Sequence, residues 1–428
     1  MTFTLYVDGD RWRAHTESVR ARVREVIHTE HGVDGDLVPV IKGNGYGLGN
    51  RRLADEAARL GLTRIAVGTV FEAQQLAGQT EADILVLTPF EPADRIAASA
   101  WSDLAESAAS QRITRTVSSR ASWDVLAAGP GPVRVVLEGL TSMGRFGLTP
   151  DELRDLLLDP STIDALAQDR IRLEGLALHL PLVQPSIDHR AIPGSRWHDA
   201  GVGPASPPKA SARVVESWRW GLGWQAQLAD LTESLTQSLT QSLTESNAPT
   251  SSITALTSAA AVWTSHLDDS ELAVLRSALP DIALFARTGT RLWLGDRGAL
   301  RARGTVLAVH LVPKGDASGY RQRRSTRAGA IAVVGGGTAH GVALQAPSPL
   351  SSARQRIRTA GAGILEAGGR SLSPFYVGGA QRWFVEPPHM QVSLIALPQD
   401  TSLPAVGTEL DVDVRLTIAH PDRVIGLD

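Results

Sequence analysis

Residues Val38–Leu60 read VPVIKGNGYGLGNRRLADEAARL, and this stretch decides how the N-terminal part of the chain is interpreted. Its apolar start, Val38–Ile41, predicts a β-strand. Lys42 follows at once, and alternate glycines after it would let the backbone pass close to a ligand. A helix is predicted next, with an apolar face formed by Leu53, Ala57 and Leu60. The stretch is therefore a strand–loop–helix unit with a lysine at the carboxyl end of its strand.

The same unit recurs along the first two-thirds of the chain. Helix-like segments separate the apolar runs, and in one of them Thr149 and Glu152 predict a capped helix start. Eight such units predict an α/β fold whose N-terminal domain, residues 1–298, is a (β/α)8 TIM barrel. The seven further strand-like runs are Ile65–Val67, Ile84–Leu87, Ile113–Val117, Val133–Leu137, Leu173–Leu178, Ala261–Thr264 and Ile282–Phe285.

An insertion is predicted between the sixth and seventh strands, at about residues 185–258. It opens with a Pro- and Gly-rich segment that is typical of a loop. A four-residue repeat, LTESLTQSLTQSLTES, then runs from Leu231 to Ser246. The spacing of its leucines predicts one stripe on a surface helix, at Leu231, Leu235, Leu239 and Leu243.

Residues 299–428 are predicted to form a second, mostly-β domain, because the periodicity changes to that of strands. In Glu409–Ala419, for example, apolar and polar residues alternate almost without error. The other strand-like runs are Thr305–Val312, Ala330–Val334 and Met390–Leu397.

Composition excludes several classes of protein. The net charge is −3, and Lys and Arg are spread along the chain, so no nucleic-acid partner is expected. The absence of cysteine excludes disulfides and thiolate metal sites and suits a cytoplasmic protein. The chain contains no apolar stretch of about 18 residues, so no membrane span is predicted. A soluble, cytoplasmic protein with no membrane partner is expected.

Polar residues gather where the predicted barrel strands end, and in such barrels chemistry occurs at the carboxyl ends of the strands. Lys42 is the most informative, because partial burial at a barrel mouth would lower its pKa toward that of a usable nucleophile. The glycines follow the lysine, so the run does not match the phosphate-binding loop of nucleotide-binding proteins. A phosphate-bearing aldehyde held as a Schiff base on the Lys42 amine fits this run better than a nucleotide does. The other residues at these ends are Glu138, Arg145, His179, His266, Ser270 and Arg287.

VIKGNGYGLG is similar to the VVKANAYGHG motif of the alanine racemase family, the fold-type III pyridoxal-phosphate enzymes. The resemblance implies that Lys42 holds the cofactor and is the base on the D face, and that Tyr46 contacts the phosphate. LTSMGRFG resembles DTGMGRLG, which implies that Arg145 binds the substrate carboxylate. LEGLALHL resembles the EGLYTHF-type strand, which places His179 beside the second catalytic residue.

Two later segments resemble cofactor-binding segments of the family. HLDDS is similar to HCANS, which implies that His266 stacks on the pyridine ring and that Ser270 holds the phosphate. FARTGTRLWLG is similar to VRFGIAMYG, which implies that Arg287 sits against the pyridine nitrogen. The backbone amides of Gly289 and Thr290 would then contact the phosphate.

The β domain carries matches as well. VPKGDASGYRQRR resembles PGEKVSYGATY, which implies that Tyr320 is the base on the L face, with its proton loss favoured by positive charge on His179 and Arg287. RWFVEPPHMQVSLI resembles GRICMDQCMI and places Met390 near the substrate carboxylate. In the family these two residues come from a partner subunit, so the resemblance implies a homodimer with shared active sites.

The chain departs from the family pattern at several positions. Glu138 stands where many members have a carbamylated lysine, and we interpret it as supplying the same negative charge to Arg145. GTAHGV replaces GYADGY, with Thr338 and His340 at altered positions, and Gln391 replaces an aspartate. A tyrosine expected after Met390 has no counterpart. Three of these changes affect the entrance, which leaves the identity of the amino acid open. His340 and His389 lack aligned carboxylates, so no metal site is predicted.

The predicted function is interconversion of L- and D-alanine, or of another small amino acid, by Lys42 and Tyr320. Such an isomerase would supply D-alanine for cell-wall synthesis, as the family does. Two alternatives remain. One is a catalytically silent protein that binds pyridoxal phosphate or a protein partner. The other is a decarboxylase. It is disfavoured because those enzymes usually use a cysteine from the partner subunit, and this chain contains no cysteine.

Overall fold

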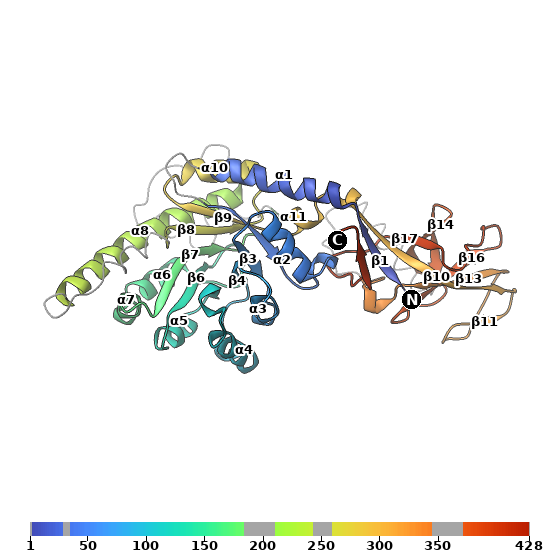
Figure 1. The fold of residues 1–428 in the computed structure, drawn as a ribbon, viewed down its shortest axis with the longest axis horizontal. Coiled ribbons are helices and arrows are strands. Elements are labelled where there is room, and N and C mark those ends of the chain that lie inside the picture. Colours follow the sequence, from blue (N-terminus) through green and yellow to red (C-terminus); the bar gives the residue numbers. More distant parts are fainter. Residues whose placement is uncertain (1, 29–34, 184–209, 243–258, 345–370, 428) are drawn as a thin grey trace. The chain divides into compact units, whose positions relative to one another are not determined.

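A computed structural model of the chain describes residues 2–28, 35–183, 210–242, 259–344 and 371–427 (Figure 1). The chain divides into two compact units, which are treated separately below. The barrel unit comprises residues 16–42 and 50–292, and the sheet unit comprises residues 1–15, 43–49 and 293–428. Residues 1–15 and 43–49 thus group with the C-terminal part of the chain, whereas the sequence suggested one boundary near residue 298.

The barrel unit contains a closed barrel of eight parallel strands in chain order, which confirms the predicted TIM-like fold. Each of the eight predicted apolar runs forms one of these strands. Because β2 pairs with both β3 and β9, the sheet has no free edge. The strands are β2 (Leu37–Ile41), β3 (Arg64–Val67), β4 (Asp83–Val86), β5 (Ile113–Val117), β6 (Val133–Gly139), β7 (Ile171–Leu178), β8 (Ala261–Ser265) and β9 (Ala283–Thr288).

Helices follow most of these strands, and Figure 1 shows α3 to α7 around the outside of the barrel strands. The capping box of Thr149 and Glu152 is present at the start of α6. In the described parts of the chain, no helix combines the length and apolar character needed to cross a membrane. The helices are α1 (Gly9–Ile27), α2 (Asn50–Arg59), α3 (Val70–Ala77), α4 (Arg95–Ala105), α5 (Arg120–Ala127), α6 (Pro150–Leu157), α7 (Pro160–Ala167), α8 (Ala212–Ser242), α10 (Asp269–Ala278) and α11 (Thr290–Leu294).

Helix α8 contains the described part of the leucine repeat. It packs against α6, α7 and α10, and Leu231 and Leu235 are fully buried. The predicted leucine stripe is therefore confirmed at these two positions, where α8 is one of the helices that cover the barrel. The N-terminal half of α8 buries Trp220 and Trp224 in the same way. Leu243 and the last part of the repeat lie outside the described residues.

The barrel interior explains where the polar residues lie. Its apolar cluster includes the stacked rings of Trp263 and Phe285, whose centroids are 4.3 Å apart. Side chains two residues apart on a strand point to the same face. The residue two positions after each interior residue therefore points into the barrel mouth. The pairs of an interior residue and the mouth residue two positions later are Val40 and Lys42, Val136 and Glu138, Ala177 and His179, and Phe285 and Arg287.

The sheet unit is built on an eight-stranded, largely antiparallel sheet, which confirms that the C-terminal domain is mostly β. The first strand of the chain, β1, joins this sheet by pairing antiparallel with β10 and parallel with β18. An apolar cluster that includes Phe3, Val306 and Phe375 packs against it. The strands are β1 (Phe3–Val7), β10 (Leu300–Val312), β11 (Ala317–Ser318), β12 (Arg323–Arg324), β13 (Gly329–Gly335), β14 (Leu372–Val377), β15 (Ala380–Phe384), β16 (Val392–Pro398), β17 (Glu409–Val412) and β18 (Arg423–Ile425).

The predicted strand Glu409–Ala419 is correct only at its beginning, because β17 ends at Val412. A turn follows in which the N–H groups of Ile418 and Ala419 both donate to the Arg415 carbonyl. The Asn44 side chain donates to the carbonyls of Leu416 and Ala419. These tertiary hydrogen bonds replace ladder bonds, so the alternating pattern does not continue as a strand.

Candidate active site at the barrel mouth

The carboxyl ends of β2, β6, β7 and β9 bring Lys42, Glu138, His179 and Arg287 into one polar layer. This layer lies directly above the apolar interior. The groups interact electrostatically with one another and with Arg145, which is in the loop after β6. Lys42 and Arg287 are 245 positions apart in the sequence. Closure of the barrel is therefore what brings the cluster together.

Lys42 is exposed at the mouth, yet the surrounding protein still affects its ammonium group. Partial burial lowers the pKa of Lys42, and the positive charges of Arg145 and Arg287 lower it further. Glu72 acts in the opposite direction. The net lowering makes the neutral amine more accessible, as a nucleophile or a proton acceptor requires.

Glu72 and Gly68 fix the surroundings of Lys42, and neither was among the predicted site residues. Glu72 accepts hydrogen bonds from the N–H of Gly68 at 2.6 Å and from that of Thr69 at 3.1 Å. A Cβ at Gly68 would lie 2.8 Å from Oε2 of Glu72 and 3.2 Å from Cβ of Lys42. A larger residue would require the Glu72 carboxylate to shift and would press against Lys42. The Thr69–Glu72 capping box was a signal in the sequence that could have located this carboxylate.

Arg287 is buried and held by main-chain oxygens at the ends of two neighbouring strands. Its Nη2 donates to the Leu178 carbonyl at 2.7 Å, and its Nε donates to the Thr264 carbonyl at 3.4 Å. Burial lowers the pKa of Arg287 to about 10, Glu138 opposes the shift and Arg145 adds to it. Arg287 therefore remains a cation at neutral pH and points a fixed charge into the mouth.

Glu138 is 2% exposed, and its carboxylate is the acidic member of the layer. Burial raises the pKa of Glu138, while Arg287 and, to a smaller extent, Arg145 lower it. Within the described residues, its Oε2 is buried without a hydrogen-bond partner. The expected pairing with Arg145 alone is thus incomplete, because the larger electrostatic partner of Glu138 is Arg287.

His179 and His266 lie edge to face, with ring centroids 5.2 Å apart. Burial and the nearby cations lower the pKa of His179 to about 3 and that of His266 to about 4. Both imidazoles are therefore neutral at neutral pH. The expectation that His179 supplies positive charge near Tyr320 is therefore wrong, because burial beside Arg287 disfavours the imidazolium form of His179.

The loop that carries Arg145 is tied down at its base. The Thr141 hydroxyl donates to the His179 carbonyl at 2.5 Å. The Ser142 N–H and hydroxyl both donate to Glu216 on α8, the hydroxyl at 2.7 Å. Glu216 is 2% exposed, and burial raises its pKa. No sequence signal identified Glu216, since it lies 74 residues from Ser142.

The residues expected at a phosphate follow β8 and β9. The Ser270 hydroxyl donates to the Asp268 carboxylate at 2.6 Å, so an anion there would compete with Asp268 for this proton. Asp268 caps α10 by accepting from the Glu271 N–H. Gly289 directly precedes α11, and Thr290 is its first residue. Their N–H groups belong to the first turn of a helix, where such groups favour anions.

The structure describes three predicted site residues in the sheet unit. Tyr46 lies in a short helical turn with φ 55°, an uncommon value for a residue other than glycine. Tyr320 lies between β11 and β12 and is 84% exposed. Met390 lies two residues before the start of β16 and is 70% exposed. All three residues belong to the sheet unit, whereas the polar layer belongs to the barrel unit.

The histidines considered for a metal each contact a single carboxylate. His340 Nε2 lies 3.2 Å from Oδ1 of Asp422, and His389 Nε2 lies 2.6 Å from Oε1 of Glu386. The sequence had suggested no aligned carboxylates, and tertiary folding supplies one to each. Across the described ranges, no group of three or more His, Asp and Glu side chains could hold a metal ion.

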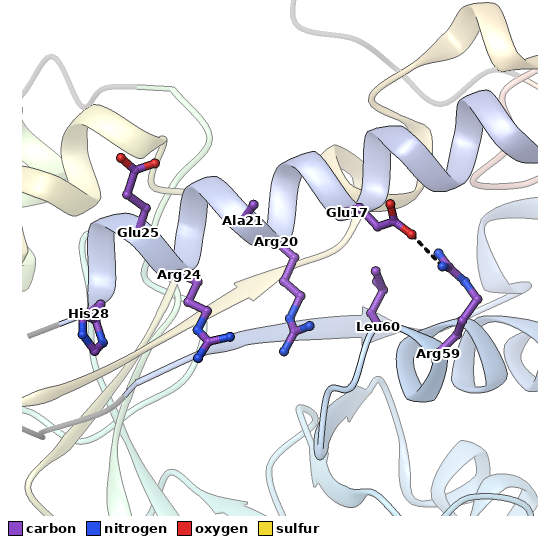
Figure 2. Close-up of a pocket in the computed structure, with 8 residues that line it drawn as sticks. All are labelled: Glu17, Arg20, Ala21, Arg24, Glu25, His28, Arg59 and Leu60. Carbon is purple, nitrogen blue, oxygen red and sulfur yellow. Dashed lines mark hydrogen bonds and ion pairs between the residues drawn. The ribbon is translucent and has the colours of Figure 1, made fainter.

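A groove of about 660 Å³ lies between α1 and α2 on the outside of the barrel unit (Figure 2). Figure 2 shows Arg20 and Arg24 extending side by side from α1, while Arg59 pairs with Glu17 at 2.7 Å. None of the predicted site residues lines this groove. The polar layer at the barrel mouth is therefore separate from this groove.

Part of the chain is similar in sequence to alanine racemases. Residues 14–192 match the family model for the alanine racemase N-terminal domain. An alanine racemase from Geobacillus stearothermophilus is 37% identical over 124 residues, which are 28% of this chain and 29% of that protein. The alignment to this curated relative thus spans less than a third of its length.

Solved structures share the fold over nearly the whole chain. An alanine racemase from E. faecalis has a TM-score of 0.55 and 18% identity, over 97% of this chain and 91% of that one. The alanine racemase from Bartonella henselae, solved with covalently bound pyridoxal phosphate, has a TM-score of 0.53 and 18% identity. It covers 96% of this chain and 90% of that one. At this identity, the likeness to both structures concerns the fold alone.

Proposed function

Because the chain belongs to the alanine racemase family, we propose that it is a pyridoxal-phosphate-dependent racemase of alanine or another small amino acid. The observation that carries the proposal is the polar layer of Lys42, Glu138, His179 and Arg287 above the barrel core. A lysine with a lowered pKa and a buried arginine face the same mouth. That combination suits a cofactor that needs one amine and one fixed cation.

The residues of the barrel mouth fit pyridoxal phosphate. The donor set offers the Lys42 amine for the aldehyde carbon, the Arg287 guanidinium for the ring nitrogen and the neutral His266 ring for a stacking contact. Gly289 and Thr290 at the start of α11, together with Ser270 and Tyr46, are the candidates for the phosphate. When bound, the cofactor supplies an electron sink for the bond that breaks at the substrate Cα.

Two bases on opposite faces are required, because racemisation removes the Cα proton on one side and returns a proton on the other. Lys42 is proposed to hold or accept the proton on the D face, and the Tyr320 hydroxyl to do so on the L face. Arg145 would bind the substrate carboxylate, with Met390 nearby. An arginine at the ring nitrogen leaves that nitrogen unprotonated, which disfavours transamination.

Glu138 is proposed to balance the cations of the mouth. Its carboxylate interacts with Arg287 more than with Arg145, so it would steady both the cofactor-facing and the substrate-facing guanidinium. Its second oxygen, unpartnered among the described residues, is positioned to accept a further hydrogen bond. The environment of Tyr320 would then depend on Arg287 rather than on His179.

Tyr320 and Met390 would reach this mouth from a partner subunit, so the proposal includes a homodimer with shared active sites. Their exposure suits residues that complete a site on another chain. The oligomeric state can be measured by sedimentation. Mixed dimers of Lys42→Ala and Tyr320→Phe subunits should recover activity at one of two sites if the sites are shared.

The decisive experiment uses the fact that the chain has three lysines, Lys42, Lys209 and Lys314. The purified protein is mixed with pyridoxal phosphate, its visible absorbance is recorded, and the bound cofactor is fixed by borohydride reduction. Peptide mapping should place the reduced adduct on Lys42. Lys42→Ala should remove the absorbance and Lys314→Ala should keep it. An adduct on another lysine would contradict the proposal.

Activity is then tested by solvent-deuterium exchange at Cα of L- and D-alanine and L- and D-serine. Exchange with both enantiomers of one of these amino acids is the expected result. Cofactor binding without exchange would identify the silent alternative, and carbon dioxide release would identify a decarboxylase. Activity on alanine alone, with larger amino acids inert, would reject a broadened specificity.

A further inference from the structure

The turn that carries Tyr320 is held by a buried carboxylate. Tyr320 is 84% exposed, but its backbone N–H donates to Oε1 of Glu386 at 3.0 Å. The N–H of Arg321 donates to the other oxygen of Glu386 at 3.4 Å. Glu386 is 6% exposed. An exposed side chain on a hairpin of two-residue strands thus has its main chain fixed by a buried charged group from elsewhere in the unit.

His389 links the same carboxylate to the Tyr320 ring. Its Nε2 lies 2.6 Å from Oε1 of Glu386, and its ring centroid lies 4.4 Å from that of Tyr320 at an interplanar angle of 40°. Burial alone would raise the pKa of Glu386, but the hydrogen bonds from His389 and from the two backbone N–H groups keep it below its ordinary value. The carboxylate is therefore charged at neutral pH.

Gly319 shows how closely the turn approaches Glu386. Its φ of +73° lies in the left-handed region, and a Cβ there would lie 2.5 Å from the Glu386 carboxyl carbon. A larger residue would separate the turn from the carboxylate. The backbone and the ring of Tyr320 are thus constrained by Glu386 and His389 together.

We propose that Glu386 and His389 are positioning residues that orient Tyr320 as the base on the L face of the substrate. This inference rests on the proposed function. A tyrosine on a short exposed hairpin would otherwise sample several orientations, and loss of alignment of about 1 Å can lower a rate by about 100-fold. The carboxylate fixes the backbone of the turn, and the imidazole fixes the plane of the phenol.

The first test measures the turn itself in the cofactor-free protein, by amide hydrogen exchange of peptides covering residues 317–324. Glu386→Ala should accelerate exchange of the Tyr320 amide by about 10-fold, because it removes a hydrogen bond to a charged acceptor. Glu386→Gln keeps an acceptor and should have a smaller effect. Glu409→Gln, which perturbs the 2.6 Å hydrogen bond from Tyr6 in the eight-stranded sheet of the same unit, should leave this peptide unchanged.

The second test measures deuterium exchange at Cα of L- and D-alanine with the holoenzyme. Glu386→Ala should slow exchange from L-alanine by about 10-fold or more and change exchange from D-alanine less than about 2-fold, since Lys42 serves the D face. KM should change less than kcat. His389→Phe retains a ring against Tyr320, so it should keep more L-face exchange than His389→Ala.

The outcomes separate this inference from the proposed function. A wild-type protein that exchanges neither enantiomer overturns both. An active wild type whose Glu386→Ala and His389→Ala variants retain L-face exchange overturns the positioning role alone. Equal loss with both enantiomers, together with a lower free energy of unfolding, indicates a purely structural role and also overturns it.

Discussion

The Glu216 carboxylate, on α8, accepts hydrogen bonds from both the N–H and the hydroxyl of Ser142, three residues before Arg145. Because Glu216 is buried, its removal leaves an N–H without its acceptor. Glu216→Ala should therefore lower the free energy of unfolding by about 1–3 kcal/mol and loosen the Arg145 loop. KM for the amino acid should rise more than kcat falls.

Glu233→Gln is the matched control for this prediction, since Glu233 is an exposed glutamate on the same helix. Denaturant unfolding and steady-state kinetics on both variants provide the measurement. An unchanged KM in an otherwise folded Glu216→Ala protein would show that the loop does not depend on this carboxylate.

Gly68→Ala tests the packing around Lys42. The added methyl group would lie 2.8 Å from Oε2 of Glu72 and 3.2 Å from Cβ of Lys42, so one of these side chains must move. Affinity for pyridoxal phosphate should fall by about 10-fold, as a loss of roughly 1.4 kcal/mol would produce. Absorbance titration measures it. Gly78→Ala, where a Cβ meets nothing within 4 Å, should bind the cofactor as wild type does.

Glu138 and Arg287 should behave as a coupled pair. Arg287→Gln removes the main positive charge near the buried carboxylate, so the pKa of Glu138 should rise further and stability should fall. Glu138→Gln should relieve part of this cost. A double-mutant cycle in the cofactor-free protein should give a coupling free energy of about 0.5–3 kcal/mol. Additive effects of the two substitutions would contradict the pairing.

The two histidines at the mouth should make stability depend on acid pH. Their folded-state pKa values of about 3 and about 4 lie below the ordinary value of 6.5. The unfolded chain therefore binds more protons between these values, and stability rises with pH across this window. The two neutral imidazoles therefore contribute fully to the free energy of unfolding above about pH 6.5, and this contribution is lost as the pH falls toward 3.

Denaturant unfolding of the cofactor-free protein at pH 4 to 7 measures this effect. His179→Gln and His266→Gln should each flatten the acid side of the stability curve. A wild-type slope in both variants would mean that the imidazoles of the mouth are not held neutral by folding.

Much of the barrel could be predicted because its signals are local. Each strand is a short apolar run, and the side-chain period of two places Lys42, Glu138 and Arg287 in the mouth once Val40, Val136 and Phe285 face the core. The proposal that Lys42 is a site residue therefore needed only its position at the end of one strand. The stripe of Leu231 and Leu235 was predicted, but the repeat alone cannot show that α6, α7 and α10 are the helices that α8 packs against.

What the sequence determined by itself is the succession of strands and helices and the polar residues at the strand ends, since neighbouring residues encode both. Only the tertiary structure decided that Glu216 holds Ser142, that Glu386 and His389 hold Tyr320 and that Asn44 bonds to the turn after β17. It also decided that His179 and His266 are neutral. These properties arise when groups from distant segments exclude water and exchange hydrogen bonds, and no local pattern records which groups will meet.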